Sequence, residues 1–290
     1  MKYITLFLIF MILIYTLSIE KINVPFIYQL QNIDLQKIYT FYTPKFLVID
    51  VFYLNDKDKV YLKKLQKDGT KILAYLSIGE AESYRDYWKD AWKKNPPKWL
   101  GKENKYWKGN YKVKYWYSEW KNIVFKTIDK ILSYNIDGLY LDLIDSYKYW
   151  SENGYEIIFT ANEMIRFLSE IKEKVNNLLI VPQNGEDIID FDFNNLYIKS
   201  IDGIGIETLF FYKNRKLKSE KRLTYTLKIQ NSEKFVLVTD YIYPPNNENI
   251  LKEFINLCEK YHFYGYPANK NQRLKDISLG LKYYKKYEGN

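Results

Sequence analysis

The chain alternates short apolar runs with longer stretches in which apolar residues recur every three or four positions. The short runs predict β-strands that begin at Phe46, Lys71, Tyr111, Gly138, Asn177, Gly203, Lys234 and His262. Several of these runs are continuously apolar, which is typical of parallel strands covered on both faces.

The longer stretches predict amphipathic helices between the strands. The apolar positions of two of them are Val124, Ile128, Ile131 and Leu132, and Met164, Leu168, Ile171 and Val175. Gly69 stands where a helix should end before the strand that begins at Lys71. Strands separated by helices, roughly thirty residues apart, predict a single α/β domain with a (β/α)8 barrel fold. A doubly wound open sheet is the competing fold, but no glycine-rich nucleotide motif follows the first predicted strand.

The first twenty residues differ from the rest of the chain. Lys2 is followed by a run of about sixteen apolar residues and then by the polar stretch "IEKIN", which matches a secretory signal. No small-x-small cleavage motif is visible, so an uncleaved membrane anchor is the alternative. We expect residues 1–20 to be a signal peptide or anchor, residues 24–290 to form the barrel, and the protein to be secreted or held at the cell surface.

Composition narrows the possible partners and cofactors. The net charge is +9, but the lysines are spread along the chain and no basic block or zinc spacing occurs, so we expect no nucleic-acid partner. The single Cys258 lies at helical spacing from Leu251 and Phe254, which indicates a buried thiol. One histidine, His262, is a poor basis for a catalytic triad or a transition-metal site. We expect no cofactor and a monomeric protein.

Acidic residues gather where the predicted strands end. In a (β/α)8 barrel these ends carry the active site. The acids there are Asp50, Glu80, Glu82, Asp142, Asp145, Glu186, Glu207 and Asp240, and Asn184 lies among them. One acid at such a position is more often a solvated charge, but the whole collection, in a chain with excess lysine, indicates a site.

Three chemistries use several carboxylates around one cleft. Hydrolysis of a glycosidic bond needs two, a hard metal ion could use Asp142 with Asp145, and a cationic ligand needs only negative charge. Aromatic residues beside the acids suit the apolar faces of sugar rings and favour a sugar cleft. These residues are Tyr84, Trp88, Tyr147 and Trp150.

Four ordered motifs resemble one known family. They are "ILAYLSIGEAESYRDYW", "NPPKWLGKENKYWKGNYKVKYWYSEW", "DGLYLDLIDSYKYW" and "VPQNGE". Over residues 24–270 the chain resembles glycoside hydrolase family 114, the endo-α-1,4-polygalactosaminidase-like barrel domains. The resemblance implies a barrel that cleaves α-1,4-linked galactosamine-type polymers without a metal and with retention of configuration.

The resemblance also implies roles for residues. Asp142 matches the strand-four nucleophile, and Glu207 matches the strand-six general acid/base, whose pKa would have to be raised. Further motif positions imply substrate binding by Glu80, Asp145, Asn184 and Glu186. Strand-end position alone adds Asp50, Tyr75, Tyr212, Asp240 and Tyr266 to the predicted substrate-binding residues. The chain departs from the family pattern at Tyr117 and Ser118, where an Asp is expected, which leaves one sugar contact open.

The positive net charge raises a question about the substrate. A deacetylated polygalactosamine is cationic, so acids in the cleft would have to dominate within a Debye length of about 8 Å. Either the cleft is locally acidic or the polysaccharide is neutral. A non-catalytic carbohydrate-binding barrel at the cell surface is the competing function, and it is disfavoured if Asp142 and Glu207 converge on one cleft.

Overall fold

The computed structural model describes residues 20–269 and 272–287. The predicted signal or anchor segment, residues 1–20, therefore lies outside the described residues except for Glu20. Within the described ranges, none of the helices combines the length and the apolar character that a membrane span requires.

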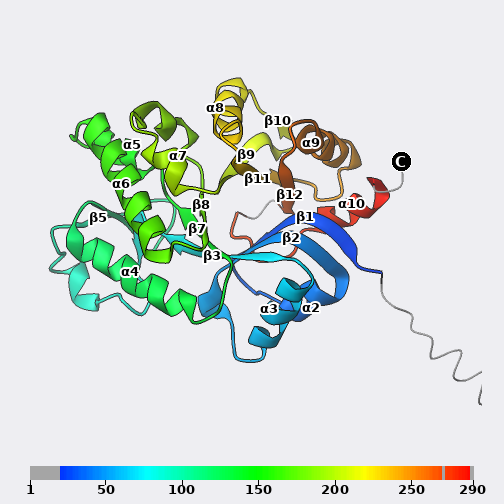
Figure 1. The fold of residues 1–290 in the computed structure, drawn as a ribbon, viewed down its shortest axis with the longest axis horizontal. Helices are drawn as coiled ribbons and strands as arrows, with labels where there is room; N and C mark the ends of the chain where they lie inside the picture. The colour runs from blue at the N-terminus through cyan, green and yellow to red at the C-terminus, as the bar shows by residue number, and fades with distance from the viewer. Residues whose placement is uncertain (1–19, 270–271, 288–290) are drawn as a thin grey trace, which may run out of the picture.

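Two sheets supply the strands of the barrel (Figure 1). The first sheet contains, in order, β1 (Ile22–Gln29), β2 (Tyr42–Ile49), β3 (Lys71–Ser77), β7 (Gly138–Asp142) and β8 (Leu179–Pro182). The second contains, in order, β10 (Arg215–Lys216), β9 (Gly203–Lys213), β11 (Phe235–Ile242) and β12 (Tyr264–Asn269). All pairs are parallel except β10 with β9.

The two sheets join at both of their edges. Gln183, just after β8, bridges in parallel to Gly205 of β9. On the other side the ring of Phe26 in β1 packs against Tyr266 of β12, with 5.8 Å between ring centroids. The five strands of the first sheet and β9, β11 and β12 thus close into one barrel. The (β/α)8 prediction is confirmed and the open doubly wound sheet is excluded.

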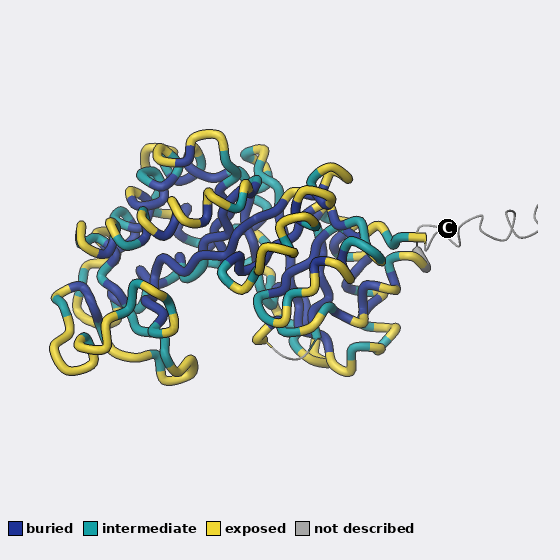
Figure 2. The backbone as a smooth tube through the Cα atoms, turned by 90° about the horizontal axis from the view of Figure 1, so that it is seen from below, coloured by how far each residue is buried: buried dark blue, intermediate teal, exposed yellow. Residues whose placement is uncertain are grey.

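Helices cover the outside of the barrel (Figure 1). They are α2 (Leu35–Phe41), α3 (Asp58–Lys67), α4 (Ser118–Leu132), α5 (Ser146–Glu152), α6 (Ile157–Val175), α7 (Leu196–Ser200), α8 (Glu220–Gln230), α9 (Glu248–Lys260) and α10 (Lys282–Tyr287). The predicted apolar face of α6 is buried throughout, and that of α4 is buried except at Leu132. Cys258 is buried in α9, as predicted, and Gly69, with φ of +93°, follows the end of α3. The tube in Figure 2 is buried along its interior and exposed at the outer turns.

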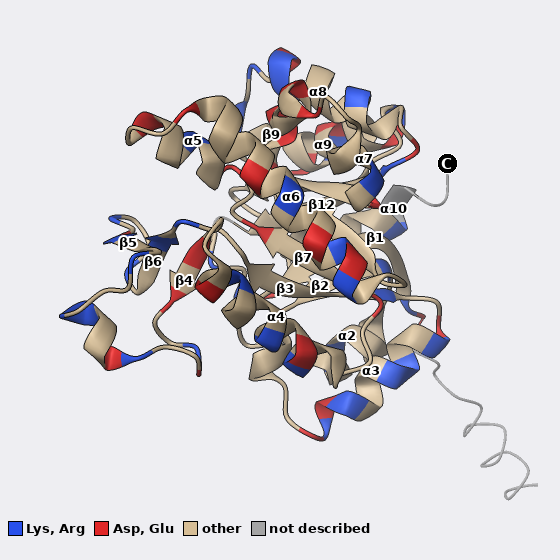
Figure 3. Ribbon diagram, turned by 60° about the vertical axis from the view of Figure 1, so that its left-hand side comes forward, with Lys and Arg blue, Asp and Glu red and all other residues tan. Residues whose placement is uncertain are grey.

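One predicted barrel strand is wrong and another was missed. The run at Tyr111 is β6 (Asn110–Val113), which pairs antiparallel with β4 (Glu80–Glu82) and β5 (Leu100–Glu103). We call residues 80–113 the lobe; its small sheet projects to one side of the barrel (Figure 3). The missed strand is β1. Because the two errors cancel, β7 is still the fourth barrel strand and β9 the sixth.

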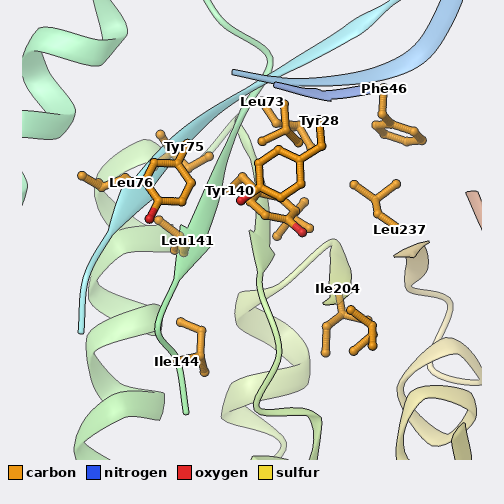
Figure 4. Close-up of a cluster of buried hydrophobic side chains, with 14 of the residues drawn as sticks. Tyr28, Phe46, Leu73, Tyr75, Leu76, Tyr140, Leu141, Ile144, Ile204 and Leu237 are labelled. Carbon is orange, nitrogen blue, oxygen red and sulfur yellow. The ribbon is translucent and has the colours of Figure 1, made fainter. Parts of the chain in front are cut away.

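Aromatic rings fill the barrel interior below the strand ends. Figure 4 shows Tyr28, Tyr75 and Tyr140 among the buried side chains between the strands. Tyr28 and Tyr140 make an edge contact, with ring centroids 5.1 Å apart. A Cβ added to Gly205 would lie only 2.0 Å from the Tyr140 hydroxyl, so a residue without a side chain is required opposite this ring. These rings form an apolar floor beneath the rim.

Candidate active site

The two predicted catalytic residues line the same cleft. Asp142 is the last residue of β7, and Glu207 lies in β9. The cleft has a volume of about 700 Å³ and opens at the carboxyl ends of the barrel strands. Parallel strands end at one rim, so residues far apart in the sequence meet there. The other predicted residues that line it are Asp50, Tyr75, Glu80, Asp145 and Asn184.

The carboxylate of Asp142 is held by two donors. Its Oδ2 accepts a 2.7 Å hydrogen bond from the hydroxyl of Tyr75, and its Oδ1 accepts one of 2.7 Å from the amide of Leu143. Burial, followed by the charge of Glu207, raises the pKa of Asp142 to about 8. The charge of Glu207 thus adds to the effect of burial and disfavours the ionised form of Asp142.

The carboxylate of Glu207 has a tyrosine donor as well. Its Oε1 accepts a 2.5 Å hydrogen bond from the hydroxyl of Tyr241 on the neighbouring strand β11. Its amide donates to Oδ1 of Asn184 at 2.9 Å. Burial raises the pKa of Glu207. Both carboxyl groups therefore favour protonation more than a solvated acid does, and a pair that shares one proton can act as an acid and a base.

Three residues at the rim have a left-handed backbone. Leu143 directly follows Asp142 and has φ of +65°, Thr208 directly follows Glu207 and has φ of +58°, and Asn184 has φ of +58°. Asparagine adopts this region readily, but a β-branched threonine does so rarely. Each strained residue costs about 1–3 kcal/mol and must be held in place by its surroundings.

Arg222 of α8 holds the rim around Glu207 from outside the barrel. Its Nη1 donates to the carbonyl oxygens of Glu207 at 2.8 Å and Thr208 at 3.1 Å, and its Nη2 donates to Oδ1 of Asn184 at 3.1 Å. The same guanidinium forms an ion pair with the buried Glu186. Glu186 therefore positions the arginine and does not line the cleft.

Asp240 of the neighbouring strand β11 holds the part of β9 that follows Glu207. It is fully buried, and its carboxylate accepts hydrogen bonds from the amides of Leu209, Phe210 and Phe211 at 2.7, 2.9 and 2.8 Å. These bonds lie where the register of β9 against β11 shifts. The segment after Glu207 is thus fixed by an arginine on its carbonyls and an aspartate on its amides.

Two more predicted substrate-binding residues lie away from the cleft. Tyr266 is fully buried, and its hydroxyl accepts a hydrogen bond from the amide of Ser278 at 3.1 Å. Tyr212 lies beyond the bulge of β9, opposite Tyr241 of β11. Like Asp240 and Glu186, neither lines the cleft, so we assign all four to the scaffold.

Asp50 lines the cleft, but its charge is already paired. Arg85 binds it through two hydrogen bonds, from Nη2 at 2.7 Å and from Nη1 at 3.1 Å, and its Nε donates to Glu82 at 2.7 Å. All three side chains are at most 7% exposed. The pairing of Arg85 with Asp50 was not predicted, because the two residues lie 35 positions apart in the chain.

Glu80 and Asp145 are the acids with spare acceptor capacity. Glu80 is 1% exposed, and its Oε1 accepts from Lys112 at 2.5 Å and from Asn104 at 2.9 Å. Its buried Oε2 has no hydrogen-bond partner among the described residues. Asp145 lines the cleft, and burial raises its pKa. Both can accept hydrogen bonds from a ligand.

The aromatic lining differs from the prediction. Of the four rings predicted to lie beside the acids, only Tyr84 lines the cleft. Tyr147 and Trp150 are buried and donate to Asp187 and to the carbonyl of Val113, and Trp88 packs on other rings of the lobe. Aromatic residues that line the cleft but were not predicted are Tyr28, Tyr53, Tyr106 and Trp107. The last two lie in the motif "ENKYWKGN", whose exposed aromatic pair between polar residues was the available signal.

The side chains of the described residues are poorly arranged to bind a metal ion. Within residues 20–269 and 272–287, no group of three or more His, Cys, Asp and Glu side chains is arranged to hold one. Asp142 and Asp145 do not form such a group with any third residue of these ranges.

A closed barrel with a half-buried carboxylate pair at its carboxyl rim is an architecture used by glycoside hydrolases. The chain matches the sequence model of glycoside-hydrolase family GH114 over residues 19–286, and it belongs to that family. It is a glycoside hydrolase with a (β/α)8 barrel.

The chain is also similar to two relatives over most of its length. An uncharacterized protein of Methanocaldococcus jannaschii is 40% identical over 270 residues, which cover 87% of this chain and 77% of the relative. An uncharacterized protein of Thermotoga maritima is 39% identical over 243 residues, covering 78% and 74%.

Two solved structures share the fold. The glycoside hydrolase domain of PelA from Pseudomonas aeruginosa superposes with a TM-score of 0.69 at 13% identity, over 89% of this chain and 98% of that one. Ega3 of Aspergillus fumigatus, in complex with galactosamine, gives a TM-score of 0.64 at 19% identity, over 90% and 97%.

Proposed function

We propose that this glycoside hydrolase cleaves within α-linked polysaccharides that contain galactosamine or N-acetylgalactosamine, with retention of configuration. One observation carries the proposal: Asp142 and Glu207 come from separate strands, line one cleft and each accept a hydrogen bond from a buried tyrosine. The amino-sugar substrate is supported by family membership and by the likeness to a structure that contains galactosamine.

The hydrogen bonds support a division of roles. Asp142 accepts from both Tyr75 and the Leu143 amide, and two donors stabilise an anion. Asp142 is the nucleophile that attacks the anomeric carbon, while Glu207 protonates the leaving oxygen. Glu207 then removes a proton from the water that hydrolyses the glycosyl-enzyme ester.

The charge of the cleft supports a cationic substrate. Its acidic lining residues are Asp50, Glu80, Glu82, Asp142, Asp145 and Glu207, and its basic ones are Lys108 and Arg273. With Arg85 and Lys112 counted as partners of these acids, and with Glu207 protonated as the mechanism requires, the ionised carboxylates outnumber the cations by one. A locally acidic cleft can therefore attract protonated amino groups at short range despite the net charge of the whole chain.

The test is cleavage of defined polymers followed by product analysis. Wild-type protein, Asp142→Asn and Glu207→Gln would be assayed on α-1,4-linked galactosamine polymers of different acetylation, with NMR of the first-formed anomer. We expect both variants to lose about a thousandfold or more in kcat/KM, and KM for the deacetylated polymer to rise with salt. The exposed acid Asp56, changed to Asn, is the matched control.

Three outcomes would contradict all or part of the proposal. Equal cleavage by the wild type and both variants would remove Asp142 and Glu207 from the chemistry. Binding of the polymer with no cleavage under any condition would favour the non-catalytic carbohydrate-binding barrel. An inverted product would retain the hydrolase but exclude the glycosyl-enzyme intermediate.

We also propose that the enzyme acts outside the cell or at its surface. The proposal rests on the apolar run at residues 1–20. Cell fractionation with an antibody to the barrel tests it, and recovery only from the cytosolic fraction would overturn it.

A further inference from the structure

The lobe presents two exposed aromatic rings to the cleft. Tyr106 and Trp107 lie between β5 and β6, and both line the cleft. Their exposed fractions are 80% and 43%. Rings of this size usually bury most of their surface, so a pair left open beside a polar cleft calls for a ligand.

Hydrogen bonds hold the loop that carries these rings. Oδ1 of Asn104 accepts from the amides of Tyr106 at 3.0 Å and Trp107 at 3.4 Å, and the amide of Asn110 donates to the carbonyl of Trp107 at 3.1 Å. The amide of Asn104 in turn donates to the carbonyl of Asn110 at 2.7 Å. The loop is closed on itself, so the backbone that carries the two rings needs little ordering when a ligand binds.

The same loop is tied to an acid of the cleft. Nδ2 of Asn104 donates to Oε1 of the buried Glu80 at 2.9 Å, and the Glu80 Oε2 has no partner among the residues described. The aromatic surface and an unpartnered carboxylate oxygen therefore belong to one connected unit. This unit offers a face for the C–H side of a sugar ring and an acceptor for an amino or hydroxyl group.

The rings lie on the lobe and not on the barrel. The lobe follows β3 and projects to the side (Figure 3), whereas Asp142 and Glu207 lie on β7 and β9. Tyr84, also on the lobe, is 54% exposed and lines the cleft too. The lining thus continues from the carboxylate pair onto an aromatic surface outside the barrel.

We propose that Tyr106 and Trp107 form a distal subsite that binds a further amino-sugar unit of the polysaccharide, away from the bond that is cleaved. The inference rests on the proposed function and extends it. Long chains occupy this subsite and short ones do not reach it, so it makes the enzyme favour polymers and cleave at internal positions.

The test measures how activity depends on chain length. Wild type, Tyr106→Ala and Trp107→Ala would be assayed on α-1,4-linked galactosamine oligomers of increasing length. We expect the ratio of kcat/KM for long over short oligomers to fall about tenfold or more in each variant, with most of the change in KM. Phe193, which is 71% exposed and does not line the cleft, gives the matched control Phe193→Ala, for which the ratio should equal that of the wild type.

Separate outcomes concern the subsite and the proposed function. An unchanged ratio in Tyr106→Ala and Trp107→Ala, with normal thermal melting, would overturn the subsite while leaving the hydrolase intact. If wild type cleaves no oligomer, the proposed activity fails, and binding of the same oligomers to Asp142→Asn is measured by calorimetry. Weaker binding of long oligomers after Trp107→Ala is added would still support the subsite, and equal binding would overturn it.

Discussion

Removing the hydroxyl of Tyr75 tests how its hydrogen bond affects the protonation of the carboxylate pair Asp142 and Glu207. Tyr75→Phe keeps the ring, which is 7% exposed and packed in the barrel, and deletes only the 2.7 Å bond to Asp142. A hydrogen bond to a charged group contributes about 1.5–3 kcal/mol. At about 1.4 kcal/mol per factor of ten, its loss corresponds to roughly a 10- to 150-fold fall in kcat/KM near neutral pH.

The direction of the pH effect follows from which form the bond stabilises. The Tyr75 hydroxyl favours ionised Asp142, so its loss raises the pKa of Asp142 further above about 8. Under the proposed roles, the productive form has Asp142 ionised and Glu207 protonated. A higher proton affinity at Asp142 makes that form scarcer and moves the kcat/KM–pH profile to higher pH, by about one to two units if the whole bond energy is lost.

Tyr241→Phe is the matched control for this prediction. Tyr241 donates to Glu207, so its loss favours the protonated acid. The profile should again move to higher pH, but kcat/KM should fall less than in Tyr75→Phe. The measurement is the kcat/KM–pH profile of each variant on a galactosamine oligomer. A Tyr75→Phe enzyme with the wild-type rate and profile would refute the assigned roles. A larger fall in kcat/KM for Tyr241→Phe than for Tyr75→Phe would refute them as well.

Three further changes test the scaffold of the site. Arg222→Lys should lower kcat about tenfold or more with little change in KM, because one ammonium cannot replace a guanidinium that bonds the carbonyls of both Glu207 and Thr208. Steady-state kinetics measure this, and a wild-type kcat in the lysine variant would contradict it. Asp240→Ala should lower the free energy of unfolding, measured in urea, by about 3 kcal/mol or more, because three buried amides lose their acceptor. A loss under about 1 kcal/mol, the contribution of one ordinary hydrogen bond, would contradict the role of Asp240 in holding β9. Gly205→Ala should cost about 1–3 kcal/mol through overlap with a tyrosine ring, and an unchanged urea midpoint would contradict it.

The spacing of apolar residues predicted the fold, because this spacing differs between buried barrel strands and amphipathic helices. The failures have local causes as well. β1 was missed because Asn23 and Pro25 interrupt its apolar run. The stretch at Tyr111 looks like a strand and is one, but whether a strand joins the barrel depends on its partners, and β6 pairs within the lobe. Pairing between distant segments cannot be read from periodicity.

The sequence predicted which residues lie near the site better than it predicted what each of them does there. Parallel strands bring their ends to one rim, so Asp142, Glu207 and Glu80 could be placed in one cleft from sequence. The partners Arg85 of Asp50 and Arg222 of Glu186 could not, because 35 and 36 residues separate the members of these pairs. The same holds for aromatic rings, whose direction depends on which face of α5 or of the lobe they occupy.

The left-handed residues at the rim also affect how this enzyme could be stabilised. Leu143 and Thr208 hold a conformation that glycine or asparagine adopts with less strain. Both directly follow the two proposed catalytic carboxylates, so relaxing the backbone there would change where those carboxylates point. An engineering strategy that raises thermal stability by replacing strained residues would choose these two positions first. The replacements would raise the melting temperature and lower the turnover number. Engineering for heat resistance should therefore start from the outer helices and leave the rim as it is.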